Sequence, residues 1–117
     1  MSVLTQIKAA ADIPAADLGD QFPANEPQGE PVAMIRSKDF RDGPSAGVWE
    51  CTPGRWKRAV KNEEFAHFVK GRCRFHHENG EVIDIAAGDA VHFPANTRGT
   101  WEVIETVRKT YFLVPLA

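Results

Sequence analysis

The sequence has no long hydrophobic run and no strong charge imbalance. No stretch approaches the ~18 apolar residues that a membrane-spanning helix requires, and the net charge of -2 provides none of the basic excess typical of nucleic-acid-binding proteins. We therefore expect neither a membrane nor nucleic acid as a partner. Basic residues do concentrate between positions 55 and 74. We interpret them as solvated strand faces, with an anion site as the alternative.

Cysteine is scarce as well. Cys51 and Cys73 stand outside any Cys-x-x-Cys motif, and the N-terminal residues form no secretory apolar run. Thiols of this kind are usually small buried hydrophobic groups and not nucleophiles. The pattern predicts a cytoplasmic protein without a structural disulfide.

The chain has room for one domain. Its 117 residues lie within the usual size of a single domain, and 43% of them are hydrophobic, which is enough for one core. Frequent prolines in residues 1–31 predict an extended N-terminal arm, with at most a short helical turn near residues 5–11. Residues 32–117 are expected to form a β-barrel domain, because their hydrophobic pattern repeats every second residue.

Short strands separated by Gly, Pro and polar turns fill this second segment. The expected strands are 32–35, 47–51, 55–60, 65–70, 72–77, 81–85, 90–93, 99–104 and 108–114. Asn79-Gly80 predicts a type I′ hairpin between 72–77 and 81–85, with Cys73 and Phe75 sharing an apolar face with Ile83 and Ile85. So many short strands indicate a sandwich or a barrel.

The segment 65–70 is apolar on both faces. One face is expected to line the barrel, and the other needs a cover from the N-terminal arm or from a second subunit. This pattern predicts a homodimer.

Two glycine-punctuated stretches, 64–71 and 88–101, point to a family. The spacing of Glu64 with Gly71, and of Gly88 with Pro94, resembles the two motifs of the cupin superfamily. The segments 47–56 and 99–109 are similar to small single-domain cupins grouped with the (S)-ureidoglycine aminohydrolase cupin domain and an ethanolamine-utilisation cupin. The resemblance runs from about Val32 to Val114. It implies an all-β fold, a cupin double-stranded β-helix (jelly-roll) barrel in a single domain with an extended N-terminal arm.

The resemblance also shows which metal ligands the chain has lost. Cupins use one Glu and three His, and this chain keeps only Glu64. Depending on the motif spacing, the first two His positions hold Arg58 and Val60 or Lys57 and Ala59, and Gly99 stands at the third. One carboxylate supplies too few donors for a tight site. We therefore expect no cofactor, and a bound Mn, Zn, Ni or Fe is the disfavoured alternative.

Two other histidines are candidates for a rescued site. His67 lies three residues from Glu64, so strand alternation points it to the opposite face. The orientation of His92 does not follow from the pattern. We interpret both as structural histidines.

Strand alternation then predicts what surrounds Glu64 inside the barrel. The expected ligand-binding residues are Trp56, Arg58, Glu64, Phe68 and Trp101. Arg58 would form a buried ion pair with Glu64 or clamp the carboxylate of a ligand. A mostly apolar concavity with few polar groups is typical of small-molecule sites.

Three functions remain open. The preferred one is binding of a small polar or anionic metabolite in the lumen without a tightly bound metal. The second is a cupin hydrolase or isomerase, similar to ureidoglycine aminohydrolase, in which Glu64 is catalytic as general base or serves as a metal ligand. The third is a dimeric structural or interaction module whose barrel is plugged by Trp56 and Trp101.

Overall fold

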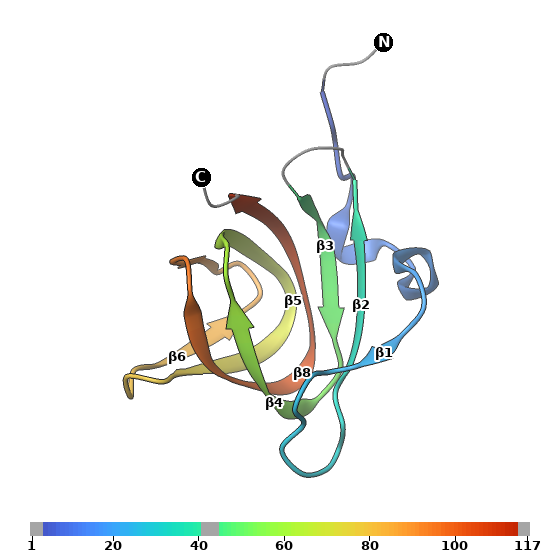
Figure 1. Ribbon diagram of the computed structural model, residues 1–117. Coiled ribbons are helices and arrows are strands. Elements are labelled where there is room, and N and C mark those ends of the chain that lie inside the picture. The colour runs from blue at the N-terminus through green and yellow to red at the C-terminus, as the bar shows by residue number, and fades with distance from the viewer. Residues whose placement is uncertain (1–3, 41–44, 115–117) are drawn as a thin grey trace.

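The structure, a computed structural model, describes residues 4–40 and 45–114 and consists mainly of β-strands (Figure 1). Its two helical segments are short 3-10 turns, η1 (Ala10–Asp12) and η2 (Ala15–Leu18). The strands are β1 (Phe22–Pro23), β2 (Met34–Asp39), β3 (Ala46–Cys51), β4 (Gly54–Val60), β5 (Glu63–His77), β6 (Val82–Ala86), β7 (Ala90–Phe93) and β8 (Thr97–Val114). The predicted all-β class is confirmed. In the described residues no helix has the length and apolar character needed to cross a membrane.

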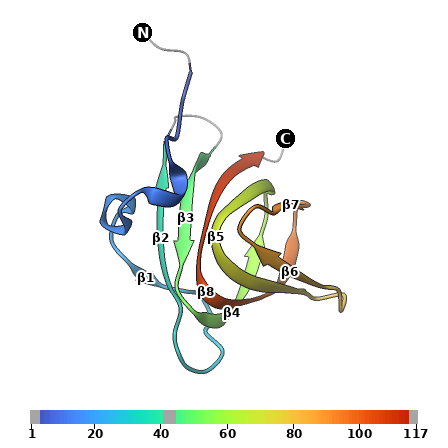
Figure 2. The same cartoon turned by 180° about the vertical axis from the view of Figure 1, so that it is seen from behind.

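Strand β8 organises the sheet. Its first half pairs with β4, its second half pairs with β3, and both halves pair with β5, all antiparallel. The sheet runs β1-β2-β3-β8-β5-β6, with β4 joined to β8 and β7 joined to β5. In Figures 1 and 2 the long strands β5 and β8 curve around the barrel interior, while β2 and β3 extend along one side. Residues far apart in sequence therefore face one another inside the barrel.

The two longest strands are continuous where the sequence pattern predicted breaks. Segments 65–70 and 72–77 form one strand, and so do 99–104 and 108–114. Gly71 is the point at which β5 bends, because the pairing register with β8 shifts around it. Its φ is 85°, and a Cβ at this position would lie 2.1 Å from the backbone oxygen of Thr106. Both features require glycine.

The hairpin between β5 and β6 forms at the predicted place, but its turn differs from the prediction. Cys73 pairs with Ile85 and Phe75 with Ile83, as expected. Gly80 alone has a positive φ in this turn, so the type I′ assignment is wrong. The Gly80 amide donates to the His77 carbonyl at 2.9 Å, which makes a type I turn followed by a left-handed glycine.

The N-terminal arm packs beside β2 and β3 and does not extend freely (Figure 2). Leu18 is fully buried there. Arg108, 1% exposed, holds the arm from β8: its Nη1 donates to the backbone carbonyls of Ala10, Ala11 and Ile13 at 3.0, 3.2 and 2.6 Å. Its Nη2 lies 2.7 Å from a carboxylate oxygen of Glu50, which is also buried. A buried cation therefore ties the arm to the barrel.

The expectation for the cysteines agrees with the structure. Cys51 and Cys73 are free and buried in the apolar core. Burial is the largest influence on each thiol and raises its pKa to about 12. Neither is a thiolate at neutral pH, so both behave as small hydrophobic groups.

The outer face of β5 is only partly covered. Phe65 remains 55% exposed, opposite Phe112 of β8, which is 39% exposed. His67, on the same face, is exposed as alternation predicted. The arm contacts β5 through η1 but leaves this pair of rings at the surface. The homodimer and the cytoplasmic location stay predictions.

Candidate functional site

Glu64 lies at the centre of a buried cluster of charges. It projects from the inner face of β5 with 1% exposure, and both of its carboxylate oxygens face cations. Arg58 on β4 donates from Nη2 to Oε1. Lys109 on β8 places its Nζ 2.7 Å from Oε2. We call Arg58, Glu64 and Lys109 the buried triad.

An ion pair between Arg58 and Glu64 was one of the two expected arrangements of Arg58, but the contact with Lys109 was not expected. The sequence did contain the information that places Lys109 on the inner face of the barrel. Alternation from Trp101 along one uninterrupted strand places residue 109 on the inner face, and β8 is such a strand. The two predicted strands 99–104 and 108–114 concealed this continuity, so the side chain at 109 had no assigned face.

Aromatic rings surround the two cations. The Lys109 Nζ lies 4.5 Å from the ring centre of Trp49, its cross-strand neighbour on β3, and 5.4 Å from that of Trp101. The Arg58 guanidinium carbon lies 5.1 Å from the ring centre of Phe93. Such cation–π contacts are strongest where water is excluded. The rings stabilise the positive charges and keep solvent from them.

The triad shifts the pKa values of its members. For Lys109 the pKa is lowered to about 8: burial is the largest cause, the like charge of Arg58 adds to it, and Glu64 acts in the opposite direction. Burial alone would raise the pKa of Glu64, but attraction to Lys109 and Arg58 holds it below its usual value of 4.5. Glu64 is therefore ionised at neutral pH, and Lys109, although still mostly protonated there, loses its proton at a lower pH than an exposed lysine does.

A cavity of about 190 Å³ adjoins the triad. All three triad residues line it, with Trp49 and Tyr111 among its other walls. Tyr111 is fixed by a hydrogen bond from its hydroxyl to Asp39 of β2. The remaining wall residues are Ser37, Val60 and Leu113. The cavity thus combines apolar walls with one carboxylate and two cations.

Of the five predicted ligand-binding residues, Arg58 and Glu64 line this cavity and the other three do not. Trp56, Phe68 and Trp101 are buried in the hydrophobic core. Trp101 is at its centre, with the rings of Phe75 and Phe93 at 5.0 and 5.7 Å. The middle of the barrel is therefore filled by side chains, and the cavity lies to one side of them, beside the triad.

One buried nitrogen atom of the triad has no hydrogen-bond partner among the described residues. It is Nη1 of Arg58, a residue that lines the cavity. Buried donors usually find a partner, because leaving one unpaired costs about 1–3 kcal/mol. This atom marks where an acceptor from a ligand would be stabilised.

The residues present do not fit a metal. The described part of the chain contains no group of three or more His, Cys, Asp or Glu side chains positioned to hold one. The carboxylate of Glu64 is directed at two cations, which repel a divalent ion. At Gly99, where the resemblance implies a His ligand, a Cβ would lie 2.4 Å from the His76 carbonyl oxygen and 2.6 Å from the Phe75 ring. No imidazole fits there without displacing Phe75.

We expect Gly99→His to destabilise the protein without creating a metal site. The added side chain overpacks the core, which costs about 1–3 kcal/mol. Urea unfolding measures the cost, and elemental analysis of protein purified without chelator measures Mn, Zn, Ni and Fe. Ala59→His, exposed on the neighbouring strand β4, is the control. Stoichiometric metal in Gly99→His at unchanged stability would contradict this interpretation of the site.

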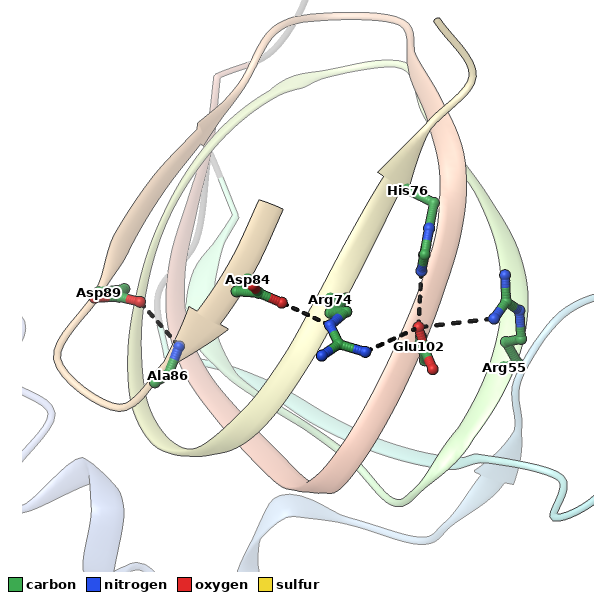
Figure 3. A network of polar contacts seen from close by, with 7 residues as sticks. All are labelled: Arg55, Arg74, His76, Asp84, Ala86, Asp89 and Glu102. Atoms are coloured by element: carbon green, nitrogen blue, oxygen red, sulfur yellow. Dashed lines mark hydrogen bonds and ion pairs between the residues drawn. The ribbon is translucent and has the colours of Figure 1, made fainter. Parts of the chain in front are cut away.

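A second group of charges lies on the outer face of the barrel and differs from the triad (Figure 3). Glu102 of β8 contacts His76 at 2.8 Å, and Arg55 and Arg74 at 3.7 and 4.0 Å. These side chains are 29–47% exposed. Solvent screens such pairs, so they contribute little to stability. This network links strands and does not form a site.

The other histidines agree with structural roles. His92 is exposed, and its Nε2 lies 2.6 Å from a carboxylate oxygen of Glu63. It borders a larger hollow of about 480 Å³ near β6 and β7, whose acidic residues Glu81, Asp84 and Asp89 are exposed. We place the candidate site at the triad because buried charges of both signs converge there beside a cavity.

Solved structures with the same fold include three informative relatives. The EutQ protein of Clostridium difficile is 14% identical, and the match covers 77% of this chain and 76% of that chain at a TM-score of 0.66. A DUF861 family protein from Thermotoga maritima is 31% identical over 57% of this chain and 76% of its own, at a TM-score of 0.56. A DUF861 family protein from Pseudomonas syringae pv. tomato is 25% identical, with 83% of this chain and 45% of that chain covered at a TM-score of 0.67.

The comparison with curated proteins gives no match. The comparison with protein families gives one match. Residues 39–111, which are more than half of the chain and include the whole buried triad, match the EutQ-like cupin domain. The resemblance to ethanolamine-utilisation cupins and the expected cupin barrel are thereby confirmed, and the chain belongs to the EutQ-like cupin domain family.

Proposed function

We propose that this protein binds a small metabolite carboxylate in the cavity beside Arg58, Glu64 and Lys109, without a bound metal. One observation carries the proposal: a buried lysine and a largely buried arginine share a single carboxylate. With Lys109 protonated the triad has an excess positive charge inside an apolar wall. An uncompensated buried charge is costly, and an anionic ligand would neutralise it.

The geometry of Arg58 supports the same ligand class. Its Nη2 is used by Glu64, while its buried Nη1 has no partner among the described residues. A guanidinium binds carboxylates through parallel N–H donors, so the free edge suits a second carboxylate. The cavity limits the size of that ligand. About 190 Å³ corresponds to on the order of six water molecules at about 30 Å³ each.

The two alternatives receive less support. A general base needs a pKa near neutrality, whereas the cations hold the pKa of Glu64 below its usual value. The filled barrel interior agrees with a structural module, but such a module does not explain why a buried lysine and a buried glutamate meet a largely buried arginine beside a cavity. Homodimerisation through the exposed face of β5 remains a separate proposal, which light scattering tests, and it is compatible with ligand binding.

Thermal unfolding with small carboxylates tests the proposal. At 100 times Kd a ligand selective for the folded state stabilises it by about 2.7 kcal/mol, a rise in Tm on the order of 10 °C for a domain of this size. We expect Tm to rise with acetate, propionate, lactate or pyruvate, but not with the corresponding amides or with chloride at equal ionic strength.

A matched pair of variants locates the effect. Arg58→Ala should abolish the Tm shift, since it removes the free guanidinium edge but leaves the Glu64–Lys109 pair. Arg55→Ala, on the exposed face of the same strand, should retain the shift. Absence of a shift with every carboxylate, or an equal shift in Arg58→Ala, would contradict binding at the triad.

A further inference from the structure

Lys109 differs from every other described lysine in its surroundings. It is the only lysine in the described residues that is buried, with 3% of its side chain exposed. A lysine on a surface keeps its proton until about pH 10.4, and its amine is then solvated. Lys109 instead faces a small cavity and is enclosed by Trp49, Phe68, Phe93 and Trp101.

These surroundings are those of a nucleophilic amine. Lysines that attack carbonyl carbons are activated by desolvation in a hydrophobic pocket or by a neighbouring cation. Lys109 has both features, because aromatic rings exclude water and Arg58 is bound to the same carboxylate. An anion-binding site alone would be served by a surface lysine or a second arginine, since neither needs to lose its proton.

We propose that the Lys109 amine forms an imine with the carbonyl carbon of a small 2-oxo acid whose carboxylate is bound by Arg58. The inference rests on the proposed function and names its ligand class. A 2-oxo acid carries an electrophilic carbonyl directly beside a carboxylate. It therefore matches an amine and a free guanidinium edge that meet at one carboxylate, Glu64.

The chemical step balances without another reactant. The neutral Nζ adds to the carbonyl carbon, an N–C bond forms, and the carbonyl oxygen takes up a proton as the nitrogen loses one. The nitrogen lone pair then expels the resulting hydroxyl group, which takes the second proton of the nitrogen and leaves as water, so that a C=N bond joins Lys109 to the acid. Glu64, 2.7 Å from Nζ, holds the amine in place beside the carbonyl carbon.

The volume of the cavity suits the smaller members of the class. Its volume of about 190 Å³ equals on the order of six water molecules, which suits a three- or four-carbon acid such as pyruvate or 2-oxobutyrate. Tyr111 and Trp49 would contact the carbon end of such a ligand, because both line the cavity with the triad.

Reductive trapping tests the inference on the intact chain. The protein is incubated with pyruvate and cyanoborohydride, which delivers hydride to the imine carbon, and is then digested and mapped by mass spectrometry. We expect a mass increase equal to that of pyruvic acid less one oxygen atom, located at Lys109 and at least tenfold enriched over exposed Lys57, Lys61 and Lys70. An adduct no richer at Lys109 than at those three lysines overturns the imine.

Two variants and a pH series complete the experiment. Lys109→Arg keeps the positive charge and should lose the adduct, and Lys109→Met provides a second test if arginine is not accommodated. The initial rate of trapping at Lys109 should level off above about pH 8, whereas trapping at exposed lysines continues to rise toward pH 10. A rate at Lys109 that follows the exposed lysines throughout counts against the inference.

Lactate separates this inference from the proposed function. Lactate has the carboxylate of pyruvate but no carbonyl, so it tests binding alone. If both acids raise Tm and no adduct forms at Lys109, the imine is wrong and carboxylate binding stands. If neither acid raises Tm and no adduct forms, both proposals fail.

Discussion

Glu64→Gln is expected to lower the free energy of unfolding by about 3–5 kcal/mol, the usual effect of removing one partner from a buried ion pair. The substitution keeps the shape of the side chain but leaves Arg58 and Lys109 without their shared carboxylate. Lys109 should respond by losing its proton more readily, which limits the cost at alkaline pH. Urea unfolding at pH 7 measures the change.

The pH dependence gives a second readout of the same residue. Since the pKa of Glu64 is held below its usual value of 4.5, the unfolded chain binds more protons than the folded chain just below that pH. Stabilisation by Glu64 is therefore complete above about pH 4.5 and is lost as the pH falls through its lower, folded pKa. The difference between wild type and Glu64→Gln should narrow in acid.

Glu102→Gln is the matched control for this experiment. It removes an equal charge on the outer face, where Glu102 is 30% exposed and its partners are screened by water. We expect a small change in stability. A loss at Glu64 no larger than the loss at Glu102 would show that the triad is not desolvated as the structure has it.

Arg108→Met is expected to cost a similar amount, about 3–5 kcal/mol, and to loosen the N-terminal arm. The guanidinium is 1% exposed and contacts Glu50 together with three backbone carbonyls of the arm. Methionine fills much of the same volume but supplies no donor, so these acceptors lose their partner in a buried place. Chemical unfolding measures the stability, and limited proteolysis within residues 4–20 measures release of the arm.

The double variant Glu50→Gln with Arg108→Met distinguishes charge from packing. Removing both members of a buried pair is usually less harmful than removing one, so the double variant should recover part of the stability lost in Arg108→Met. Arg74→Met, an exposed arginine on the outer face of β5, is the control and should leave arm proteolysis unchanged. Equal proteolytic release of the arm in Arg108→Met and Arg74→Met would contradict the anchoring role of Arg108.

The barrel was predictable from local pattern because strand alternation and turn residues are properties of neighbouring positions. The turn at Gly80 follows the end of β5 near the predicted place. The exposure of His67 followed from its three-residue distance to Glu64. The bend at Gly71 was not predictable. A glycine between two apolar segments indicates a turn in the sequence, and only its close approach to the Thr106 backbone shows that the strand continues through it.

The site was predictable in part for the same reason. Arg58 and Glu64 come from β4 and β5, six residues apart, so a short-range alternation argument brought them together. Lys109 is 45 residues further along than Glu64, and its place depends on how β8 crosses both β4 and β3. Trp49 was missed likewise, because its contact with Lys109 exists only through the β3–β8 pairing.

The sequence by itself determined the all-β class, the loss of three cupin ligands and the presence of one carboxylate at the cupin glutamate position, because motif spacing and alternation are recorded along the chain. The tertiary structure decided that this carboxylate lies between two cations, that aromatic rings fill the middle of the barrel, and that a small cavity remains beside the triad. Burial and the convergence of distant strands produce these features, since the pKa of a lysine changes only when the fold removes water from it or brings other charges close.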